Sequence, residues 1–323
     1  MHKRLISAMV VIGLGISSSA FSANEGFDEY VSGLKVEARS NGISESIINS
    51  AFDNIQYTER AVKADKNQPE KKLTLDEYIP RAVPDWKVKQ ANSLYNEHKA
   101  ALDRIGREYG VQPRFIVALW GVESNFGRLM GDYNVVEALS TLAYDGRREA
   151  FFRKQVMAAL QILNEGHIAP ENMKGSWAGA MGQPQFMPTS FLTYAVDGNN
   201  DGKIDIWQNV DDVFASAANY LKMSGWNDEY TWGRQVKIVS PVSSDLKGVE
   251  REKGKSLADW QSIGVRKLNG EPLPDVAINA WLVQPDDNHG RAYLVYGNYQ
   301  TLLKWNRSHY FALAVSHLAD KIR

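Results

Sequence analysis

Eight consecutive residues are the most informative part of this chain: Trp120-Gly121-Val122-Glu123-Ser124-Asn125-Phe126-Gly127. Glu123 ends a series spaced i, i+3, i+4 and i+7 that begins with Ile116, Leu119 and Trp120. The four share one face of a predicted helix, and only Glu123 is ionisable. Burial disfavours a charged carboxylate, so a raised pKa would make Glu123 a proton donor at neutral pH, as a general acid that cleaves an ether-like bond must be. A structural glutamate paired with an arginine or a backbone group fits the same pattern.

The composition of the chain sets wider limits. Its 323 residues are 44% hydrophobic and 23% charged, which is typical of a globular protein with a substantial core in one or two domains. A formal net charge of -1 gives no reason to expect nucleic acid as a partner. The absence of cysteine excludes disulfides, a lipidated N-terminal cysteine and cysteine-ligated metals. There is neither an H-E-x-x-H nor a G-x-S-x-G motif.

Residues 1–23 are expected to be a signal peptide. Lys3 and Arg4 precede an apolar run over residues 5–16, and small residues lead to the expected cleavage position near Ser22 or Ala23. The run is too short to span a bilayer. We therefore expect a periplasmic protein whose mature chain, residues 24–323, has no transmembrane segment. An uncleaved anchor is the alternative.

Hydrophobic spacing predicts an α+β fold that is mainly α. One long helical segment over residues 88–109 should end at Gly110, and the helix that contains Glu123 should begin near Pro113 and run to Gly127. Further helices are predicted over 135–142, 149–163 and 308–322, and an exposed loop over 63–72. Strands of a small antiparallel sheet are predicted at 236–239, 277–283 and 292–296, with a turn at 285–290. The helical core then comprises about 24–229 and 298–323, and the small β-containing part about 230–297.

The segment from Gly175 to Ser190 combines small residues with side chains of fixed hydrogen-bonding geometry. Glycine lets backbone approach a ligand closely, and the Ser and Gln groups of this segment could bind hydroxyls or an acetamide. A glycine-rich turn inside a packed core is the alternative interpretation.

Residues 197–205 resemble the start of an EF-hand loop. Oxygen-bearing side chains occupy positions 1, 3 and 5, Gly202 occupies position 6, and an apolar residue occupies position 8. Position 12 is the neutral Gln208, so Asp211 at position 15 is the candidate for the missing carboxylate. The ligands predicted for a structural Ca²⁺ are Asp197, Asn199, Asp201, Lys203 and Asp211. An Asp/Asn-rich turn without metal is the alternative.

Taken together, these motifs resemble the lytic murein transglycosylase B family of peptidoglycan lytic transglycosylases. The resemblance covers nearly all of the mature chain and is carried by the Tyr78 region, residues 120–127, residues 179–190, the EF-hand-like loop and residues 305–308. It implies a lysozyme-like core, a helical domain and a small β-containing domain beside a substrate groove.

The resemblance also implies roles for particular residues. Glu123 matches the single catalytic acid, and Ser176 and Gln185 match residues that hold the acetamide and hydroxyl groups of the sugars. Asn306 matches the polar residue of a Tyr-Asn-x-Ser motif, in which Trp305 here replaces the tyrosine and so keeps a stacking face but lacks the hydroxyl. The aromatic residues that match the groove are Tyr78, Tyr220 and Tyr310.

The activity implied is cleavage of the β-1,4 bond between N-acetylmuramic acid and N-acetylglucosamine in peptidoglycan strands, with formation of a 1,6-anhydro ring. Glu123 would act first as acid and then as base. A lysozyme-type hydrolase on the same fold would need a second carboxylate, for which Asp132, Glu137 and Asp145 are candidates. A non-catalytic glycan-binding module and a Ca²⁺ sensor would each fit part of the same set of motifs.

Overall fold

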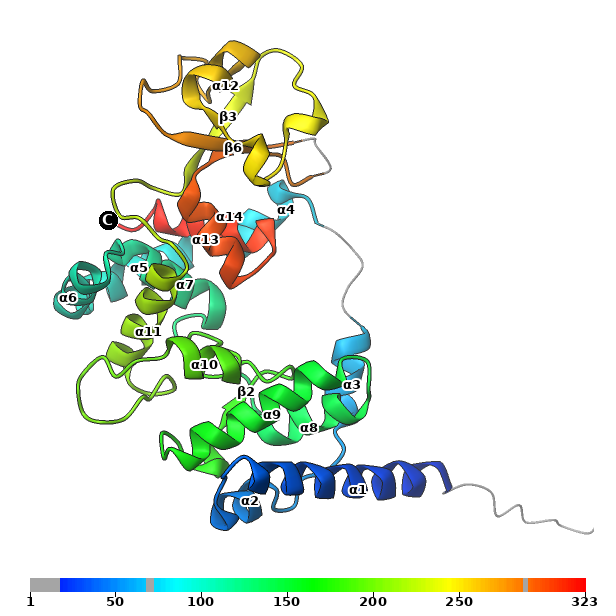
Figure 1. Cartoon of the computed structure of the whole chain (residues 1–323). Coiled ribbons are helices and arrows are strands. Elements are labelled where there is room, and N and C mark those ends of the chain that lie inside the picture. Colours follow the sequence, from blue (N-terminus) through cyan, green and yellow to red (C-terminus); the bar gives the residue numbers. More distant parts are fainter. Residues whose placement is uncertain (1–17, 68–72, 287–289) are drawn as a thin grey trace, which may run out of the picture.

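The computed structural model describes residues 18–67, 73–286 and 290–323 (Figure 1). Most of the predicted signal peptide and the tip of the predicted turn at 285–290 lie outside these residues. The expected cleavage positions, Ser22 and Ala23, fall within the first helix, α1 (Ser18–Ser40). In the described part of the chain, no helix combines the length and the apolar character needed to cross a membrane.

The described chain is mainly helical, as the sequence predicts. The helices before the small sheet are α1, α2 (Glu45–Ala51), α3 (Glu59–Lys66), α4 (Leu75–Ala82), α5 (Asp85–Glu97), α6 (Lys99–Tyr109), α7 (Pro113–Ser124), α8 (Val135–Tyr144), α9 (Glu149–Asn164), α10 (Pro188–Tyr194) and α11 (Val210–Met223). Those that follow are α12 (Leu257–Ile263), α13 (Gly297–Trp305) and α14 (His309–Ala319). Three short 3-10 turns are η1 (Pro170–Asn172), η2 (Ser244–Leu246) and η3 (Arg251–Lys253).

The single long helix predicted over residues 88–109 is wrong, because the chain breaks at His98 into α5 and α6. The break lets the His98 ring pack against Trp120, with ring centroids 6.0 Å apart, and against Phe214 at 5.5 Å. These partners are distant in sequence, so local periodicity could not reveal the break. Similarly, Lys63 to Lys66 of the predicted loop belong to α3.

Helix α7 is shorter than predicted, ending at Ser124 rather than at Gly127. Asn125, Phe126 and Gly127 take left-handed backbone angles, with φ of 51°, 60° and 79°. This turn folds the Phe126 ring back onto the helix, edge-on to Trp120 at 5.4 Å between centroids. Because α7 ends at Ser124, Glu123 lies in its last turn.

The sheet predicted near the C-terminal end has five short strands rather than three. They are β3 (Gly233–Ile238), β4 (Lys255–Ser256), β5 (Val265–Lys267), β6 (Asn279–Val283) and β7 (Ala292–Val295), in the order β4-β6-β7-β3-β5 with antiparallel pairing throughout. A separate core of its own includes Trp260, which donates its indole N–H to the carbonyl of Ala280 (2.8 Å). A second, two-stranded ladder pairs β1 (Tyr133–Asn134) with β2 (Lys174–Gly175).

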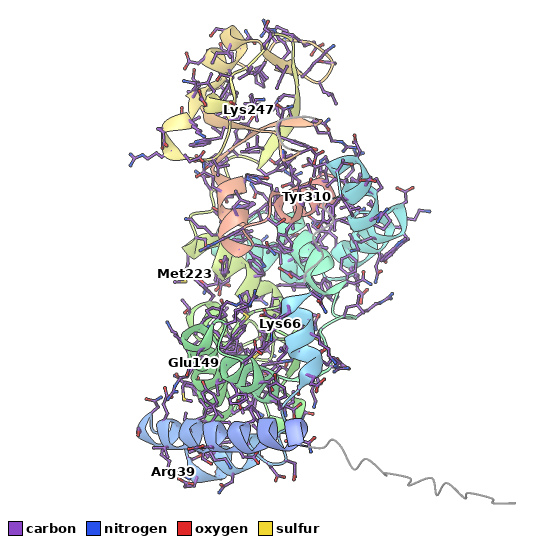
Figure 2. All side chains as sticks on the ribbon, turned by 90° about the vertical axis from the view of Figure 1, so that its right-hand side faces the viewer. Arg39, Lys66, Glu149, Met223, Lys247 and Tyr310 are labelled. Carbon is purple, nitrogen blue, oxygen red and sulfur yellow. The ribbon has the colours of Figure 1, made fainter. Side chains whose placement is uncertain are left out.

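The elements stack in three tiers along the molecule. Figure 1 shows α1 and α2 beside α8 and α9 at one end, α7 with α5, α11, α13 and α14 in the middle, and the five-stranded sheet at the other end. Figure 2, turned by 90°, shows the same order, with Arg39 at the α1 end, Lys247 at the sheet end and Tyr310 between them. Residues from the first half of the chain and from its last third therefore meet in the middle tier.

Helix α7 lies at the centre of the middle tier. It packs against α14, α5 and α11, and its residues from Phe115 to Gly121 are all buried. Gly121 leaves room for two neighbouring side chains, Phe126 in the turn after α7 and Leu318 on α14. A Cβ placed at Gly121 would lie 2.7 Å from the Phe126 ring and 3.1 Å from Leu318. The position of the helix end thus depends on the absence of a side chain at residue 121.

We expect Gly121→Ala to lower the free energy of unfolding by about 1–3 kcal/mol, because the added methyl group overpacks this contact. Urea unfolding monitored by circular dichroism measures the change. The matched control is Gly33→Ala in the exposed middle of α1, where an added Cβ meets nothing within 4 Å. The control should stabilise the protein by roughly 0.5–1 kcal/mol. If Gly121→Ala did not lower the free energy of unfolding relative to Gly33→Ala, this account of the packing would be contradicted.

Candidate active site

Glu123 is the central residue of the candidate site. It lies in the last turn of α7 and remains partly accessible to solvent. The indole N–H of Trp305 donates a hydrogen bond to its Oε1 (2.6 Å). Burial raises the pKa of Glu123 from its ordinary value of 4.5 to about 8, even though the Trp305 bond acts in the opposite direction. Glu123 is therefore protonated at neutral pH and can act as a proton donor.

A tyrosine near Glu123 pairs with a second tyrosine from another helix. Tyr78 on α4 and Tyr310 on α14 pack edge to face, with ring centroids 5.3 Å apart. Burial, and then the nearby charge of Glu123, raise the pKa of Tyr78. The hydroxyl of Tyr310 donates a hydrogen bond to Asp286. Asp286 also accepts the backbone N–H of Leu75, whose nitrogen lies 3.1 Å from Oδ1 and 3.0 Å from Oδ2. This bond joins the start of α4 to the segment that follows β6.

A second aromatic group holds Trp305. The Tyr220 ring of α11 lies 4.6 Å from the Trp305 ring, and the Phe186 ring lies 5.3 Å from it. The hydroxyl of Tyr220 donates to the backbone carbonyl of Lys304 (2.8 Å), which fixes the end of α13. Of the predicted aromatic residues, Tyr220 thus contacts Trp305, whereas Tyr78 lies near Glu123 and pairs with Tyr310.

The loop from Gly175 to Phe186 is held by its own backbone and side chains. The Oγ of Ser176 accepts the N–H groups of Ala178 (3.3 Å) and Ala180 (3.0 Å), so its hydroxyl hydrogen remains to be donated. Gln185, with a left-handed φ of 53°, donates through its amide nitrogen to the carbonyls of Met130 (3.1 Å) and Gly182 (2.8 Å). Both bonds use amide N–H groups, which leaves the carbonyl oxygen of Gln185 as an acceptor.

The glycines of this loop serve close packing inside the protein. A Cβ at Gly179 would lie 2.4 Å from the Leu139 side chain, and one at Gly175 would lie 2.3 Å from the Ala180 carbonyl. This is the packed turn that the sequence left open as an alternative. It holds Ser176 and Gln185 in fixed positions, so the two interpretations are compatible.

Gln183 is a residue of this region that the sequence analysis did not single out. It is buried, and its amide links two segments: the oxygen accepts the indole N–H of Trp120 (2.6 Å), and the nitrogen donates to the carbonyl of Trp207 (2.9 Å). Its side chain also lies against Gly127, where a Cβ would be 2.5 Å from its oxygen. The only signal in the sequence was its place in the Gly182-Gln183-Pro184-Gln185 run.

Asn306 lies at the junction of α13 and α14. Its side chain is exposed, and its Oδ1 accepts the backbone N–H of Ser308 (3.0 Å). The structure brings Asn306 near the site through its neighbour Trp305, whereas the hydrogen bond to Glu123 belongs to Trp305. The sequence suggested that replacing tyrosine by Trp305 removes a polar contact, but the indole supplies one of its own.

The other carboxylates considered as a second catalytic group are engaged elsewhere. Glu137 accepts the N–H of Gln56 (3.1 Å) and the hydroxyl of Thr58 (2.8 Å). The remaining two form ion pairs, Asp145 with Lys66 (2.9 Å) and Asp132 with Arg60 (3.5 Å). Each of these acids therefore has a partner in α3 or in the residues just before it.

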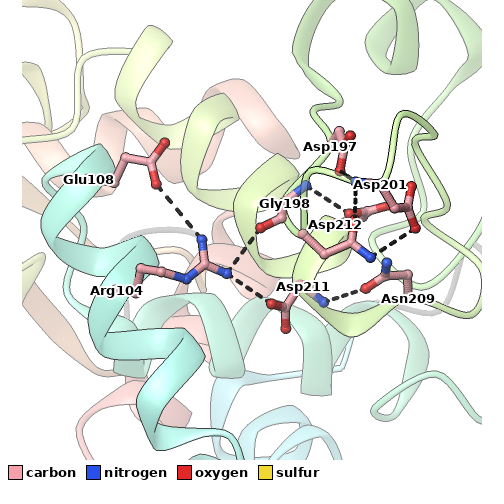
Figure 3. Close-up of polar contacts among 9 residues, drawn as sticks. Arg104, Glu108, Asp197, Gly198, Asp201, Asn209, Asp211 and Asp212 are labelled. Carbon is pink, nitrogen blue, oxygen red and sulfur yellow. Dashed lines mark hydrogen bonds and ion pairs between the residues drawn. The ribbon is translucent and has the colours of Figure 1, made fainter.

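The calcium-type loop forms a tight turn closed by its own side chains (Figure 3). Asp197 accepts the N–H groups of Gly202 (2.7 Å) and Asp201 (3.2 Å), while Asn199 donates to Asp201 (2.9 Å). Carboxylate and side-chain amide oxygens such as these are the ligands that Ca²⁺ prefers. Lys203 continues the turn, and its N–H is bonded to Asp201 (2.9 Å). Across the residues the structure describes, no three His, Asp or Glu side chains converge to hold a metal ion.

The structure does not bring Asp211 together with the other predicted ligands. Its carboxylate pairs with Arg104 (2.8 Å), which also donates to the carbonyl of Gly198 (3.0 Å) (Figure 3). The fully buried Asp212 holds the loop instead, accepting the N–H groups of Gly198 (2.8 Å) and Asp205 (2.6 Å). Burial raises the pKa of Asp212. The EF-hand spacing does not point to Asp212, because the candidate for the missing carboxylate in that spacing is Asp211.

Comparisons with known proteins show what the chain as a whole is similar to. A family model described as the transglycosylase SLT domain matches residues 26–320. The membrane-bound lytic murein transglycosylase B of Escherichia coli (strain K12) is 34% identical over 248 residues, which cover 76% of this chain and 66% of that protein. The chain thus spans slightly under two thirds of the length of this relative.

Solved structures also resemble the fold of this chain. SltB3 from Pseudomonas aeruginosa, in complex with NAG-anhNAM-pentapeptide, superposes with a TM-score of 0.86 at 40% identity, over 91% of this chain and 78% of that chain. The Escherichia coli lytic transglycosylase Slt35, in complex with calcium, superposes with a TM-score of 0.76 at 26% identity, over 93% of each chain. These matches confirm the family resemblance and the mainly helical α+β fold, with its lysozyme-like core, that the sequence predicted.

The raised pKa of Glu123 predicts a particular dependence of stability on pH. Below about pH 4.5 the carboxyl is protonated in both folded and unfolded chains. Between the unfolded value of 4.5 and the folded value of about 8, only the unfolded chain ionises, so this residue makes folding less favourable as the pH rises.

We therefore expect Glu123→Gln to be more stable than the unmodified protein by about 2 kcal/mol at pH 7, and by much less at pH 4.5. The full pKa shift from 4.5 to about 8 corresponds to a larger difference in the free energy of unfolding, but the carboxyl is partly accessible and solvent screens its charge. Urea unfolding of both proteins at several pH values between 4.5 and 8 measures the difference. A difference that stays constant over this range would rule out the raised pKa.

Proposed function

The chain belongs to the family of transglycosylase SLT domains, and on that premise we propose that it is a peptidoglycan lytic transglycosylase. Its substrate is the glycan strand of peptidoglycan, cut at the β-1,4 bond between N-acetylmuramic acid and N-acetylglucosamine. The relatives named above are lytic transglycosylases, and one was solved with a NAG-anhNAM-pentapeptide.

One observation carries the proposal: Glu123 is a protonated carboxyl, hydrogen-bonded to Trp305 and still partly open to solvent. A glycosidic oxygen is a poor leaving group unless it is protonated as the bond breaks. A carboxyl whose pKa is about 8 carries the proton that this step needs at neutral pH. After donating it, the same group becomes a base strong enough to take a proton back.

The reaction then needs only this one carboxyl. Glu123 donates its proton to the bridging oxygen, and the bond from that oxygen to C1 of the muramic acid breaks. The 2-acetamido group of the same sugar stabilises the positive charge at C1. The C6 hydroxyl attacks C1 and gives its proton to the Glu123 carboxylate, which closes the 1,6-anhydro ring and restores the acid.

The remaining site residues are proposed to bind the sugars. Tyr78, which lies near Glu123, and its ring partner Tyr310 offer aromatic faces, and Tyr220 supports the Trp305 ring. Ser176 has a hydroxyl hydrogen to donate and Gln185 a carbonyl oxygen to accept, which suits the two ends of an acetamide. Asn306 has a free amide N–H₂ next to Trp305, since its contact with Ser308 uses only Oδ1.

A hydrolase of the lysozyme type is the alternative on the same fold. It would need a second carboxylate roughly 5–10 Å from Glu123. The engagement of Asp132, Glu137 and Asp145 by other partners favours the single-carboxyl mechanism. A non-catalytic glycan-binding module is disfavoured because binding alone gives no reason to bury a carboxyl with a raised pKa.

We also propose that the loop over 197–205 binds a structural Ca²⁺. Asp197, Asn199, Asp201 and the backbone carbonyl of Lys203 would hold it. Asp211 could join only after leaving Arg104. A bound ion would add rigidity to the segment that leads from Gln185 to α11. The Slt35 structure that contains calcium supports this assignment.

Export is the last part of the proposal. The signal-peptide pattern in residues 1–23 and a substrate in the cell wall together support a periplasmic enzyme. The core of the mature protein would comprise about 24–229 and 298–323, with residues 230–297 as the small β-containing part. The order of the strands β3 to β7 supports this division.

We expect digested peptidoglycan to yield muropeptides that end in 1,6-anhydro-N-acetylmuramic acid, lighter by one water than hydrolysis products, when analysed by mass spectrometry. Glu123→Gln should reduce the rate about 10³-fold, because it removes both the acid and the base. The matched control is Asp132→Asn, the same exchange of carboxyl for amide at an exposed ion pair, which should leave the rate unchanged. Reducing-end muramic acid as the product would establish the hydrolase instead, and an active Glu123→Gln would reject the mechanism.

We expect millimolar Ca²⁺ to raise the melting temperature by about 3 °C or more over the chelated protein, because the ion binds only the folded loop. Differential scanning calorimetry measures the shift. Asp201→Asn should weaken the response, and Mg²⁺ should not reproduce it. Asp211→Asn decides whether that residue joins the ligands, since it reduces the response only if Asp211 leaves Arg104. Identical melting with Ca²⁺ and with chelator would contradict the proposed ion.

A further inference from the structure

Trp305 lies beside Glu123, at the position where the Tyr-Asn-x-Ser motif that the sequence resembles has a tyrosine, and the two side chains differ in how they hydrogen-bond a carboxyl. The two residues are far apart in sequence, at the ends of α13 and α7, and their side chains meet at 2.6 Å between Nε1 and Oε1. Within the residues the structure describes, Trp305 is the group that hydrogen-bonds the Glu123 carboxyl. This contact is therefore the main polar constraint on the orientation of that carboxyl.

The surroundings of Trp305 hold the indole N–H in one direction. Tyr220 packs edge-on to the indole at 4.6 Å, and Phe186 lies 5.3 Å away. The backbone before the ring is fixed as well, because the Lys304 carbonyl accepts the Tyr220 hydroxyl (2.8 Å) and the Lys304 ammonium donates to the Ser224 carbonyl (2.7 Å). These contacts restrict rotation of the indole away from Glu123.

An indole N–H is a donor only, whereas a phenol can donate or accept. A tyrosine at this position could donate to a carboxylate and could also accept the proton of a carboxylic acid, so the acid proton could lie on either oxygen. With Trp305, Oε1 must always be the acceptor. When Glu123 is protonated, its proton is then confined to Oε2.

We propose that Trp305 is a positioning residue that, through this donor-only hydrogen bond, keeps the transferable proton of Glu123 on Oε2 and holds the carboxylate in place after the proton has left. For its catalytic consequence this inference rests on the proposed function. In the acid step, Oε2 is the atom that protonates the glycosidic oxygen. In the base step, the same oxygen receives the C6 hydroxyl proton, while Trp305 continues to donate to Oε1.

Other titratable groups near Glu123 do not replace this bond. Titratable side chains of the surrounding helices include Tyr78 on α4, His98 after α5, Tyr220 on α11, and His309, Tyr310 and His317 on α14, and of the described residues only Trp305 acts on the pKa of Glu123 through a side-chain hydrogen bond. Tyr78 stays neutral because its pKa is raised. Burial lowers the pKa of His309 and lowers that of His317 to about 4, and their rings bond to Tyr299 (2.9 Å) and Tyr293 (3.0 Å).

The first test observes the hydrogen bond without substrate. The full chain is labelled with ¹⁵N at its nine tryptophans, and the indole signal of Trp305 is assigned by its loss in Trp305→Phe. We expect this signal to shift as the pH rises, with a midpoint near 8, and to stay in place in Glu123→Gln, where the partner no longer ionises. A signal that does not shift, or that shifts equally in Glu123→Gln, would overturn the inference.

The second test uses the pH profile of kcat/KM on peptidoglycan. Trp305→Phe keeps an apolar ring but removes the donor to the charged carboxylate. The alkaline limb, where Glu123 loses its proton, should therefore move up by roughly one pH unit, and kcat at pH 7 should fall about tenfold. Trp305→Tyr should restore most of the limb position, because it again donates to the carboxylate. It should recover less of kcat, because its hydroxyl no longer fixes the proton on Oε2.

The matched control removes an indole bond elsewhere. Trp260→Phe loses the bond to the Ala280 carbonyl (2.8 Å) in the core of the small sheet. It should lower the melting temperature without moving the alkaline limb. An unmoved limb in Trp305→Phe, or an equal shift in Trp260→Phe, would overturn the positioning role. If the unmodified protein gave reducing-end muramic acid in place of anhydro products, the proposed function itself would fail, while the result of the NMR titration would stand.

Discussion

The structure depends on one constraint: the helix at its centre, α7, is apolar along nearly its whole length and ends in a carboxyl. A charged carboxylate in these surroundings is costly, and a proton is the simplest way to reduce the cost. Glu123 accordingly has a pKa of about 8. The packing that stabilises the fold is thus the same packing that prepares the acid, because the buried part of α7 places Glu123 in largely apolar surroundings.

The rest of the middle tier holds this carboxyl from several directions. The left-handed turn after Ser124 folds Phe126 under the helix, and Gln183 ties Trp120 to the following loop. From the other end of the chain, α13 supplies Trp305, whose indole is the hydrogen-bond donor to Glu123. The site therefore exists only when segments nearly two hundred residues apart have packed together, so the integrity of the fold and activity should be closely coupled.

The sequence predicted what depends on local pattern and missed what depends on distant contacts. The apolar face that ends in Glu123, the helix start at Pro113 and three of the five strands of the small sheet, β3, β6 and β7, follow from spacing and turn residues. The break at His98 and the substitution of Asp212 for Asp211 in holding the calcium-type loop do not, because each is decided by a partner elsewhere in the fold. Trp305 shows the limit most clearly. The motif that the sequence resembles has a tyrosine hydroxyl at this position, while the structure shows an indole N–H donor.

The central claim is that burial keeps Glu123 protonated at neutral pH. The most direct measurement is a ¹³C NMR titration of the side-chain carboxyls in protein labelled at glutamate, with the Glu123 signal identified by its absence in Glu123→Gln. We expect this signal to titrate with a midpoint near 8, well apart from the exposed glutamates. A midpoint near the ordinary value of 4.5 would show that Glu123 is charged at neutral pH and would contradict the account of both its burial and its role as the acid.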